Sequence, residues 1–464
     1  TPSLERLRAE IARDGTTPSV PRSMNTAGGK ARKRVVVAGA GWCGAMAAYR
    51  LDKIPELHVT LLDTKEYMAN TPNVLRLMCV AGDEFDSLFH ASHIAHTDYV
   101  KNGDVVIGTL AAVRQDHILL GAKVGVAARA LPYDYLVIAT GTSYQSDIKT
   151  DGTSIEHRRR SLILERQRIA DAPAAVVVGG GLVGTELALD IATYFPGKKV
   201  EWLSGNQKLL SRIKGAHEVC TEVVDREAQK GTLQLSLGER GIAVDDDGRI
   251  STDRGNKTTA GARAFWCTGY RPNNAFMRDP RTNGAVGGCL DEEGFIAALP
   301  THQLAHPDLK HVFAGGDICC KARFGGGERM AAVAHTHAMV ICENIERLSG
   351  VKEGALQAAH IGIPIAEAKG GEHMKTDNEA VILSLGKTDT LFYSKQPMMK
   401  SFFQKPEETE AMWGPIESAP NGWIELGDMS FLKFGMVNDM VSGLFREGKD
   451  DWWAQFDGPR LHDA

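Results

Sequence analysis

Two copies of the motif G-x-G-x-x-G constrain the fold of this chain more than any other feature. They lie in residues 33–63 and in residues 174–204. Each follows a run of small and β-branched apolar residues, precedes a segment with helical periodicity and leads to a second apolar run. This pattern predicts a strand, a tight turn, a helix and a parallel strand, the unit that binds a dinucleotide. A single motif also fits a tight connection in another kind of α/β protein. Two motifs predict an α/β fold with two Rossmann-like domains, one for a flavin and one for a nicotinamide dinucleotide.

The three glycines of each motif have separate roles. The first turns the chain, the second lets the backbone approach a pyrophosphate, and the third lets the helix pack on the strand. In that order they are Gly39, Gly41 and Gly44 in the first motif and Gly179, Gly181 and Gly184 in the second. The phosphates are then expected at a helix N-terminus, where unpaired N–H groups and the helix dipole favour negative charge.

Two acidic residues follow strands of the first domain. Asp63 ends the first unit, where a carboxylate can accept hydrogen bonds from both hydroxyls of an adenosine ribose. The alternative is a surface aspartate at a strand end. A further buried strand in residues 311–318 ends in Gly-Gly-Asp, with Gly316 and Asp317, and a helix is expected over residues 329–348.

Two other segments predict where the chain passes between the domains. Residues 131–141 and residues 262–272 each contain a buried strand followed by Thr-Gly. We expect the first to lead into the second domain and the second to lead back. The small residues at these strand ends are Thr140, Gly141 and Gly269.

Shorter alternating segments predict antiparallel layers beside the main sheets. Residues 105–113 and 116–124 alternate like strands and have glycine breaks. A second such layer is expected within residues 232–252, around the turn at residues 245–248.

Composition limits the classes of function. A length of 464 residues corresponds to about three domains, and 43% hydrophobic with 24% charged residues is typical of a globular protein. A net charge of -5 argues against a nucleic-acid partner. The sequence has no uninterrupted apolar run of the roughly 18 residues that a membrane span needs.

The cysteines exclude a redox dithiol of the usual kind. They form no spaced disulfide framework, which predicts a reducing compartment. No C-x-x-C or C-x4-C pair occurs, and no metal-ligand pattern is present. The cysteines are Cys43, Cys79, Cys220, Cys267, Cys289, Cys319, Cys320 and Cys342.

The two ends of the sequence carry targeting and docking signals. Between Thr1 and Arg34 there are eight Lys/Arg residues against three acids, as in a remnant of an organellar targeting region or a solvated leader. Near the other end, a broad apolar helical face is predicted, which can lie on a membrane, dock a partner or cover the protein's own core. Its residues are Phe431, Leu432, Phe434, Met436, Val437, Met440, Val441, Leu444 and Phe445, followed by Trp452, Trp453 and Phe456.

At this point the sequence resembles a known family. The segments GAGWCG, IATG, GGGLVGTE, CTGYRP and FAGGD, in this order, resemble the two-dinucleotide flavoproteins that include type II NADH dehydrogenases and apoptosis-inducing-factor-like proteins. The closest similarity is to the ferroptosis-suppressor group. The resemblance covers residues 34 to about 348.

The resemblance implies a domain order. Residues 34–145 and 264–348 would form the FAD domain, with the NAD(P)H domain of residues 146–263 inserted between them. Outside the segment that the resemblance covers, we expect residues 1–33 to be a leader and linker and residues 349–464 to be an additional C-terminal α+β region.

The resemblance also implies roles for individual residues. Asp317 would hold the flavin ribitol, or else cap a helix. Glu186, expected on the first turn of the helix after Gly184, would lie where nicotinamide meets flavin; the alternative is an acid that stabilises a helix N-terminus. His337 would be a catalytic residue, although histidines in helices more often pack or cap. Cys319-Cys320 follows Asp317 and could lie near the flavin.

The implied activity is FAD-dependent NAD(P)H:quinone oxidoreduction, with a hydride passing from nicotinamide to flavin N5 and two electrons then passing to a quinone. Two departures from the family pattern bear on its substrates. The last FAD helix carries residues 334–337, Ala-His-Thr-His, instead of a Gln-rich quinone segment. Ser204 replaces the acid that selects NADH, and Lys208 and Arg212 follow, so NADPH stays open.

The sequence is also compatible with alternatives to quinone reduction. The chain could reduce a small protein electron carrier, or be a structural subunit of an organellar complex. A mitochondrial location and a peripheral membrane contact through the C-terminal region are further expectations.

Overall fold

The computed structural model describes residues 31–121, 129–146, 148–149, 152–213, 215–319, 331–357, 380–394, 423–427 and 445. The first large sheet has five parallel strands in the order β18-β9-β1-β2-β5. Their bounds are β1 Lys33–Ala38, β2 Leu57–Asp63, β5 Asp104–Ile107, β9 Tyr135–Ile138 and β18 Val312–Ala314.

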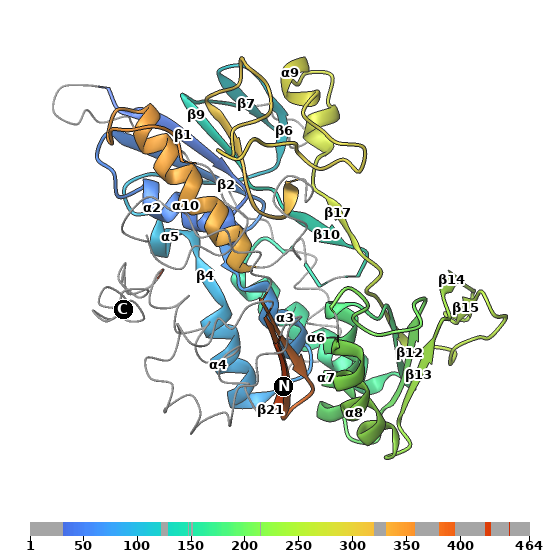
Figure 1. The fold of residues 1–464 in the computed structure, drawn as a ribbon. Helices are drawn as coiled ribbons and strands as arrows, with labels where there is room; N and C mark the ends of the chain where they lie inside the picture. The colour runs from blue at the N-terminus through green and yellow to red at the C-terminus, as the bar shows by residue number, and fades with distance from the viewer. Residues whose placement is uncertain are drawn as a thin grey trace.

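Both faces of this sheet are buried, because residues alternate between two apolar clusters along β1. Val35 and Val37 face a cluster formed with helices α2 (Trp42–Leu51) and α10 (Ala331–Leu348). Val36 and Ala38 face the opposite cluster, which includes apolar residues of the small sheet formed by β6 (Leu110–Val113), β7 (His117–Leu120) and β8 (Ala130–Pro132). Figure 1 shows α10 lying across the first sheet beside α2. A sheet buried on both faces requires the nearly continuous apolar runs seen in its strands.

The second large sheet has four parallel strands in the order β13-β12-β11-β16. Helices α6, α7 and α8 belong to this half of the molecule (Figure 1). Strand bounds are β11 Ala174–Val178, β12 Lys199–Ser204, β13 Leu233–Leu237 and β16 Arg263–Trp266. Helix bounds are α6 Ile155–Asp171, α7 Leu182–Tyr194 and α8 Ala216–Ala228. Both sheets therefore have the parallel α/β arrangement that the motifs predict.

The two sheets are joined by an antiparallel ribbon of β10 (Thr142–Tyr144) and β17 (Tyr270–Pro272), which spans between them in Figure 1. β10 follows β9 of the first sheet, and β17 follows β16 of the second sheet. The chain passes between the sheets in the segments where the Thr-Gly pairs predicted it would.

The antiparallel layers differ in part from the prediction. The first consists of β6 (Leu110–Val113), β7 (His117–Leu120) and β8 (Ala130–Pro132). The second is the hairpin of β14 (Gly241–Val244) and β15 (Ile250–Thr252).

Two strands that we expected in these layers instead extend the parallel sheets. Residues 104–107 pair with β2 as β5, and residues 233–237 pair with β12 as β13. The expectation was wrong there because each is an edge strand. A short edge strand alternates in the same way whether its partner is parallel or antiparallel.

The remaining described elements of the first half lie between these strands and helices. They are β3 Tyr67–Ala69, η1 Thr71–Asn73, α3 Val74–Leu77, α4 Gly82–Ser92, β4 His93–Ala95, α5 His96–Tyr99, η2 Ala275–Arg278, α9 Gly284–Gly287 and η3 Gly316–Ile318. Within the described residues, none of the helices is long and apolar enough to cross a bilayer.

The C-terminal region contributes an antiparallel sheet of β19 (Ala380–Leu385), β20 (Asp389–Ser394) and β21 (Trp423–Gly427). It packs on α7 and α8, and Leu383, Leu385 and Leu391 belong to the apolar core of the second half. An α+β region was expected here, but its docking site on α7 was not predicted.

Of the predicted apolar tail face, the structure describes Phe445. Its ring is 1% exposed and lies 5.5 Å from the ring of Tyr49 and 4.9 Å from that of Tyr99. This residue covers the protein's own core, in the cluster shared by α2 and α10. The other residues of the predicted face, together with Trp452, Trp453 and Phe456, lie outside the described residues.

Candidate functional site

The first glycine motif forms an open turn between β1 and α2. A side chain at Gly39, whose φ is +97°, would overlap the carbonyl oxygen of Ala139, and one at Gly44 would overlap that of Gly39. A Cβ at Gly41 would meet no atom within 4 Å. The fold itself thus requires the first and third glycines, whereas the second leaves free space at the helix N-terminus. That space suits the close approach of a pyrophosphate.

The second motif has the same geometry between β11 and α7. A side chain at Gly179, with φ +130°, would overlap the carbonyl oxygen of Cys267, and one at Gly184 would overlap that of Gly179. Gly181 again faces open space and is the N-cap of α7. The residues present therefore fit two dinucleotides.

Asp63 lies beside the first turn. Its Oδ2 atom accepts a hydrogen bond from the Ala40 N–H at 3.1 Å, and its Oδ1 atom accepts one from the Thr64 N–H at 2.6 Å. Burial by itself raises the pKa of Asp63, but the charge of Lys65 and the hydrogen bond and charge of His96 together lower the pKa by more. The net pKa is therefore well below the ordinary value. The group is a carboxylate, the form that accepts hydrogen bonds from ribose hydroxyls.

A buried histidine supports this carboxylate, although no sequence pattern indicated it. His96 Nε2 lies 3.5 Å from Asp63 Oδ2, and the Tyr99 hydroxyl lies 2.7 Å from His96 Nδ1. If Nε2–H faces the carboxylate, Nδ1 accepts the hydrogen bond from Tyr99. The tilted ring contact between Tyr99 and Phe445 then connects Phe445 of the C-terminal region to the Asp63 site.

The two Thr-Gly segments meet at the ribbon between the sheets. Thr140 Oγ1 donates to the Asn273 carbonyl at 3.0 Å, and Asn273 Nδ2 donates to the Thr140 carbonyl at 2.8 Å. Cβ atoms at Gly141 and Gly269 would meet nothing within 4 Å. Both glycines thus leave backbone accessible near the two turns.

Asp317 and His337 lie together at the end of β18. The Gly316 N–H donates to His337 Nδ1 at 3.1 Å. Asp317 Oδ2 accepts from Thr142 Oγ1 at 3.1 Å and lies 3.4 Å from Lys149 Nζ. A side chain at Gly315 would come within 2.5 Å of the sulfur of Cys43, so this turn abuts the first residues of α2. Residues distant in sequence thus gather beside the first glycine motif.

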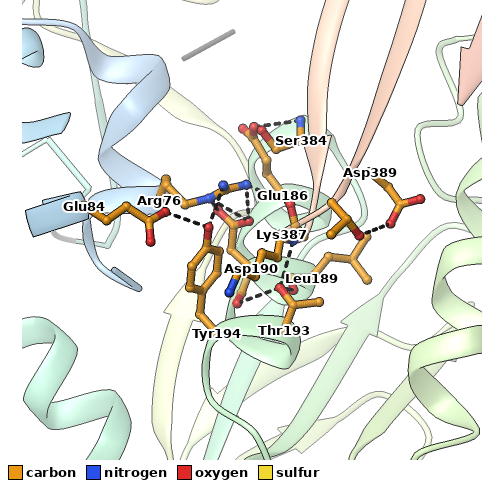
Figure 2. A network of polar contacts seen from close by, with 12 residues as sticks. Arg76, Glu84, Glu186, Leu189, Asp190, Thr193, Tyr194, Ser384, Lys387 and Asp389 are labelled. Atoms are coloured by element: carbon orange, nitrogen blue, oxygen red, sulfur yellow. Dashed lines mark hydrogen bonds and ion pairs between the residues drawn. The ribbon is translucent and has the colours of Figure 1, made fainter. Parts of the chain in front are cut away.

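Glu186 is buried, 6% exposed, and its Oε1 atom accepts a hydrogen bond from the Ser384 N–H at 3.0 Å (Figure 2). Helix α7 begins at Leu182, so Glu186 lies in its second turn and not in the first turn as we expected. The N-terminal charge effect falls off within the first turn. The observed partner comes from β19 of the C-terminal region.

A buried ion pair adjoins Glu186. Arg76 of α3 lies 3.0 Å from Asp190 of α7, and the side chains are 5% and 1% exposed. Arg76 also donates to the Gly386 carbonyl at 2.8 Å. A further hydrogen bond runs from Arg76 to the Tyr194 hydroxyl at 2.9 Å (Figure 2). One guanidinium therefore links the first half, the second half and the C-terminal sheet.

Ser204, where the sequence predicts selection between NADH and NADPH, ends β12 and is 1% exposed. Lys208, a candidate cation from the sequence, is held by Glu218, with Nζ 2.8 Å from Oε1. Arg212 is exposed.

The described cysteines carry no disulfide. Cys43, Cys79, Cys220, Cys267, Cys289, Cys319 and Cys342 are all buried and free. Burial raises the pKa of Cys43 well above the usual thiol value, with Cys319 and Cys342 acting in the same direction, which disfavours a reactive thiolate. Cys320 lies outside the described residues. In the part of the chain that is described, no group of three or more His, Cys, Asp or Glu residues could hold a metal ion.

Comparisons with known proteins agree with this architecture. Apoptosis-inducing factor homolog B of Dictyostelium discoideum is 24% identical over 358 residues, covering 71% of this chain and 84% of that protein. Ferroptosis suppressor protein 1 of Homo sapiens is 27% identical over 333 residues, covering 70% of this chain and 82% of that protein. The structure of the sulfide:quinone oxidoreductase of Aquifex aeolicus has the same fold, with a TM-score of 0.61 and 14% sequence identity. The match covers 90% of this chain and 92% of that protein.

The family assignment rests on a match that covers more than half of the chain. Residues 33–339, from the start of β1 into α10, match the pyridine nucleotide-disulphide oxidoreductase family. Its members use FAD with NAD(P)H, the two cofactors that the glycine motifs predict. The chain belongs to the pyridine nucleotide-disulphide oxidoreductase family of flavoprotein NAD(P)H oxidoreductases.

Proposed function

We propose that this protein is an FAD-dependent NAD(P)H:quinone oxidoreductase. The observation that carries the proposal is the pair of open turns at Gly41 and Gly181, joined by the β10–β17 ribbon. Each is open where a pyrophosphate would approach, and both belong to one compact arrangement of two parallel sheets. Bound FAD would supply a two-electron carrier between NAD(P)H and a second substrate.

Residues around the first turn would hold the flavin. The Asp63 carboxylate suits the adenosine ribose, and Asp317 suits the ribitol by resemblance to the family. His337 would act as a positioning residue, because its Nδ1 atom accepts the N–H of Gly316 next to Asp317. In the neutral ring the proton is then on Nε2, which is the atom that could donate one.

Glu186 would work beside the nicotinamide. The Ser384 N–H fixes its Oε1 atom, so the carboxylate is oriented before any substrate binds. An oriented charge in a water-poor site interacts more strongly with a reacting group than one in bulk solvent.

The absence of a redox dithiol from the sequence favours a diffusible acceptor for the electrons of the flavin. The sequence lacks the C-x-x-C or C-x4-C dithiol that would relay electrons to a disulfide, so electrons would leave the flavin directly. The similarity to a sulfide:quinone oxidoreductase supports a quinone as that acceptor. A mitochondrial location and contact of the C-terminal region with a membrane surface or protein partner belong to the same proposal, since quinones reside in membranes.

The test is an anaerobic titration of the purified protein with NADH and with NADPH, followed by a soluble quinone, while flavin absorbance is recorded. Bleaching by the nucleotide and recovery with quinone are expected. Bleaching without recovery would assign the acceptor to another class, such as a small protein electron carrier. Bound flavin that neither nucleotide bleaches would favour a structural subunit, and protein that binds no FAD even after reconstitution would overturn the proposal.

A further inference from the structure

The choice between NADH and NADPH is made at the carboxyl end of β12. In dinucleotide-binding domains an acid at this position binds the ribose 2′-hydroxyl of NAD, whereas an arginine nearby accommodates the 2′-phosphate of NADP. Here the position is Ser204, which provides no carboxylate.

The tertiary structure brings an arginine to this place from the next strand. A Cβ built on Gly205, the residue directly after Ser204, would lie 2.6 Å from Cγ and 2.9 Å from Nε of Arg240. The side chain of Arg240 therefore crosses over the backbone at Gly205. A side chain other than hydrogen at Gly205 would displace it.

Backbone hydrogen bonds hold the two loops together. The Glu239 N–H donates to the Ser204 carbonyl at 2.9 Å, and the Gly238 N–H donates to the Asn206 carbonyl at 3.0 Å. Arg240 is thus anchored at the ribose end of β12 by its own neighbours in sequence.

A second arginine lies at the same loop. Arg254 Nη2 would be 2.8 Å from a Cβ at Gly238, on the side where Gln207 also approaches. Arg240 and Arg254 follow different strands, β13 and β15, and meet at the loop after β12 only in the folded chain.

The charges of these arginines are not neutralised by acids in the described part of the chain. The nearby Asp253 carboxylate accepts the backbone N–H of Arg240 at 2.9 Å, and Glu239 accepts from Thr252 and Asn256. Lys208 differs, because Glu218 already holds its ammonium. Two exposed guanidinium groups without acidic partners, beside a strand end that carries Ser204 in place of an acid, suit a phosphate dianion.

We propose that Arg240, assisted by Arg254, forms a 2′-phosphate subsite and that NADPH is the preferred electron donor. This inference rests on the proposed function, in that the second glycine motif must bind a nicotinamide dinucleotide. It goes further by assigning the donor and the residues that select it.

The experiment measures binding of two nucleotide fragments to the FAD-loaded full chain by isothermal titration calorimetry. The fragments are 2′,5′-ADP, which carries the 2′-phosphate, and 5′-ADP, which lacks it. Neither fragment transfers electrons, so the result does not depend on the identity of the acceptor. We expect 2′,5′-ADP to bind about ten- to a hundredfold more tightly, as charge-assisted hydrogen bonds to one phosphate provide.

Variants assign the effect to residues. Arg240→Ala should remove most of the difference between the fragments while leaving 5′-ADP affinity unchanged, and Arg240→Lys should retain part of it. Arg254→Ala should reduce the difference by a smaller factor. Lys208→Ala is the matched control and should change nothing.

Three results would overturn the inference. They are equal affinities of the wild type for the two fragments, no binding of either fragment, and a loss of discrimination in Lys208→Ala but not in Arg240→Ala. Failure of the quinone titration with intact fragment discrimination would instead reject the acceptor and leave the subsite in place.

Discussion

The Oε1 atom of Glu186 lies 3.0 Å from the backbone nitrogen of Ser384, although the two residues are 198 positions apart. This hydrogen bond attaches the C-terminal sheet to the helix that follows the second glycine motif. It gives a buried carboxylate a fixed orientation at the position proposed for nicotinamide. The C-terminal region is thereby part of the candidate site and not only a cover for it.

Glu186→Gln should separate charge from shape at this position. Gln retains an oxygen that can accept the Ser384 N–H, so we expect the variant to fold and to bind FAD. Loss of the charge should slow turnover with a soluble quinone by about ten- to a thousandfold. Stopped-flow absorbance can divide the effect, since slow flavin reduction would place Glu186 on the nicotinamide side and slow reoxidation on the quinone side. Unchanged turnover would mean that Glu186 serves only to dock β19.

The glycine motifs can be tested with matched substitutions. Gly41→Val and Gly181→Val place a side chain in open space, so both proteins should fold. Gly41→Val should lose FAD, whereas Gly181→Val should retain FAD and weaken NAD(P)H binding by tenfold or more. Flavin absorbance and nucleotide titration provide the measurements. Loss of FAD from folded Gly181→Val would show that the two motifs are assigned the wrong way round.

Substitution of Gly184 provides the contrast to the substitutions of Gly41 and Gly181, because Gly184 is closely packed. Gly184→Val would drive its side chain into the Gly179 carbonyl, so this variant should fail to fold or lose much of its stability. A stable Gly184→Val protein would contradict the described contact between α7 and the turn.

The Arg76–Asp190 pair should contribute strongly to the association of the three parts of the chain. Arg76→Ala leaves a buried carboxylate without its main cation, and we expect a loss of about 3–5 kcal/mol in the free energy of unfolding. Urea unfolding followed by circular dichroism measures it. The double variant Arg76→Met, Asp190→Leu removes both charges and should recover part of the loss. If the double variant is less stable than Arg76→Ala, the pair is not the source of the effect.

Phe445→Ala should open a cavity between Tyr49 and Tyr99. Because the ring is fully buried, the expected cost is about 3–5 kcal/mol, and Phe445→Leu should cost less. Thermal unfolding checks the stability. A neutral Phe445→Ala substitution would argue that the tail does not dock on α2 in solution.

The pH dependence of stability should include a term from His302. This side chain is fully buried, and burial lowers its pKa to about 4, against about 6.5 when unfolded. The unfolded state therefore binds the proton first. The contribution of His302 to the free energy of unfolding is up to about 3 kcal/mol. It is fully present above a pH of about 6.5 and is lost as the pH falls toward about 4.

His302→Asn is the matched variant. His302 has φ +63°, a conformation that asparagine tolerates better than most residues. Between pH of about 6.5 and 4 the stability of this variant should fall less steeply than that of the wild type. His335 has a pKa lowered to about 4, by burial and then by Arg50, so some slope should remain. Identical slopes would show that His302 is not protonated on unfolding in this range.

The features of the fold that the sequence by itself determined depend on interactions between residues close together in the chain. Gly44 is needed because a side chain there would strike the nearby carbonyl of Gly39, and apolar runs must pair wherever both faces of a sheet are covered. Such constraints are written within about 30 residues, the length of one strand-helix-strand unit. They were sufficient for the two parallel sheets and for the family. They were not sufficient for β5 and β13, since an edge strand does not encode the direction of its partner.

Only the tertiary structure decided which distant residues meet. Ser384 reaches Glu186, His96 supports Asp63, and Arg240 crosses Gly205. These contacts join segments whose own patterns are those of ordinary strands and loops, so no local spacing marks them. Packing of whole elements brings these segments together. A polar group that becomes buried in this way must then find a partner from whichever element is adjacent, because leaving it unpaired costs about 1–3 kcal/mol. The sequence thus determined the two turns, and packing of the C-terminal sheet and the strand-end loops decided what surrounds them.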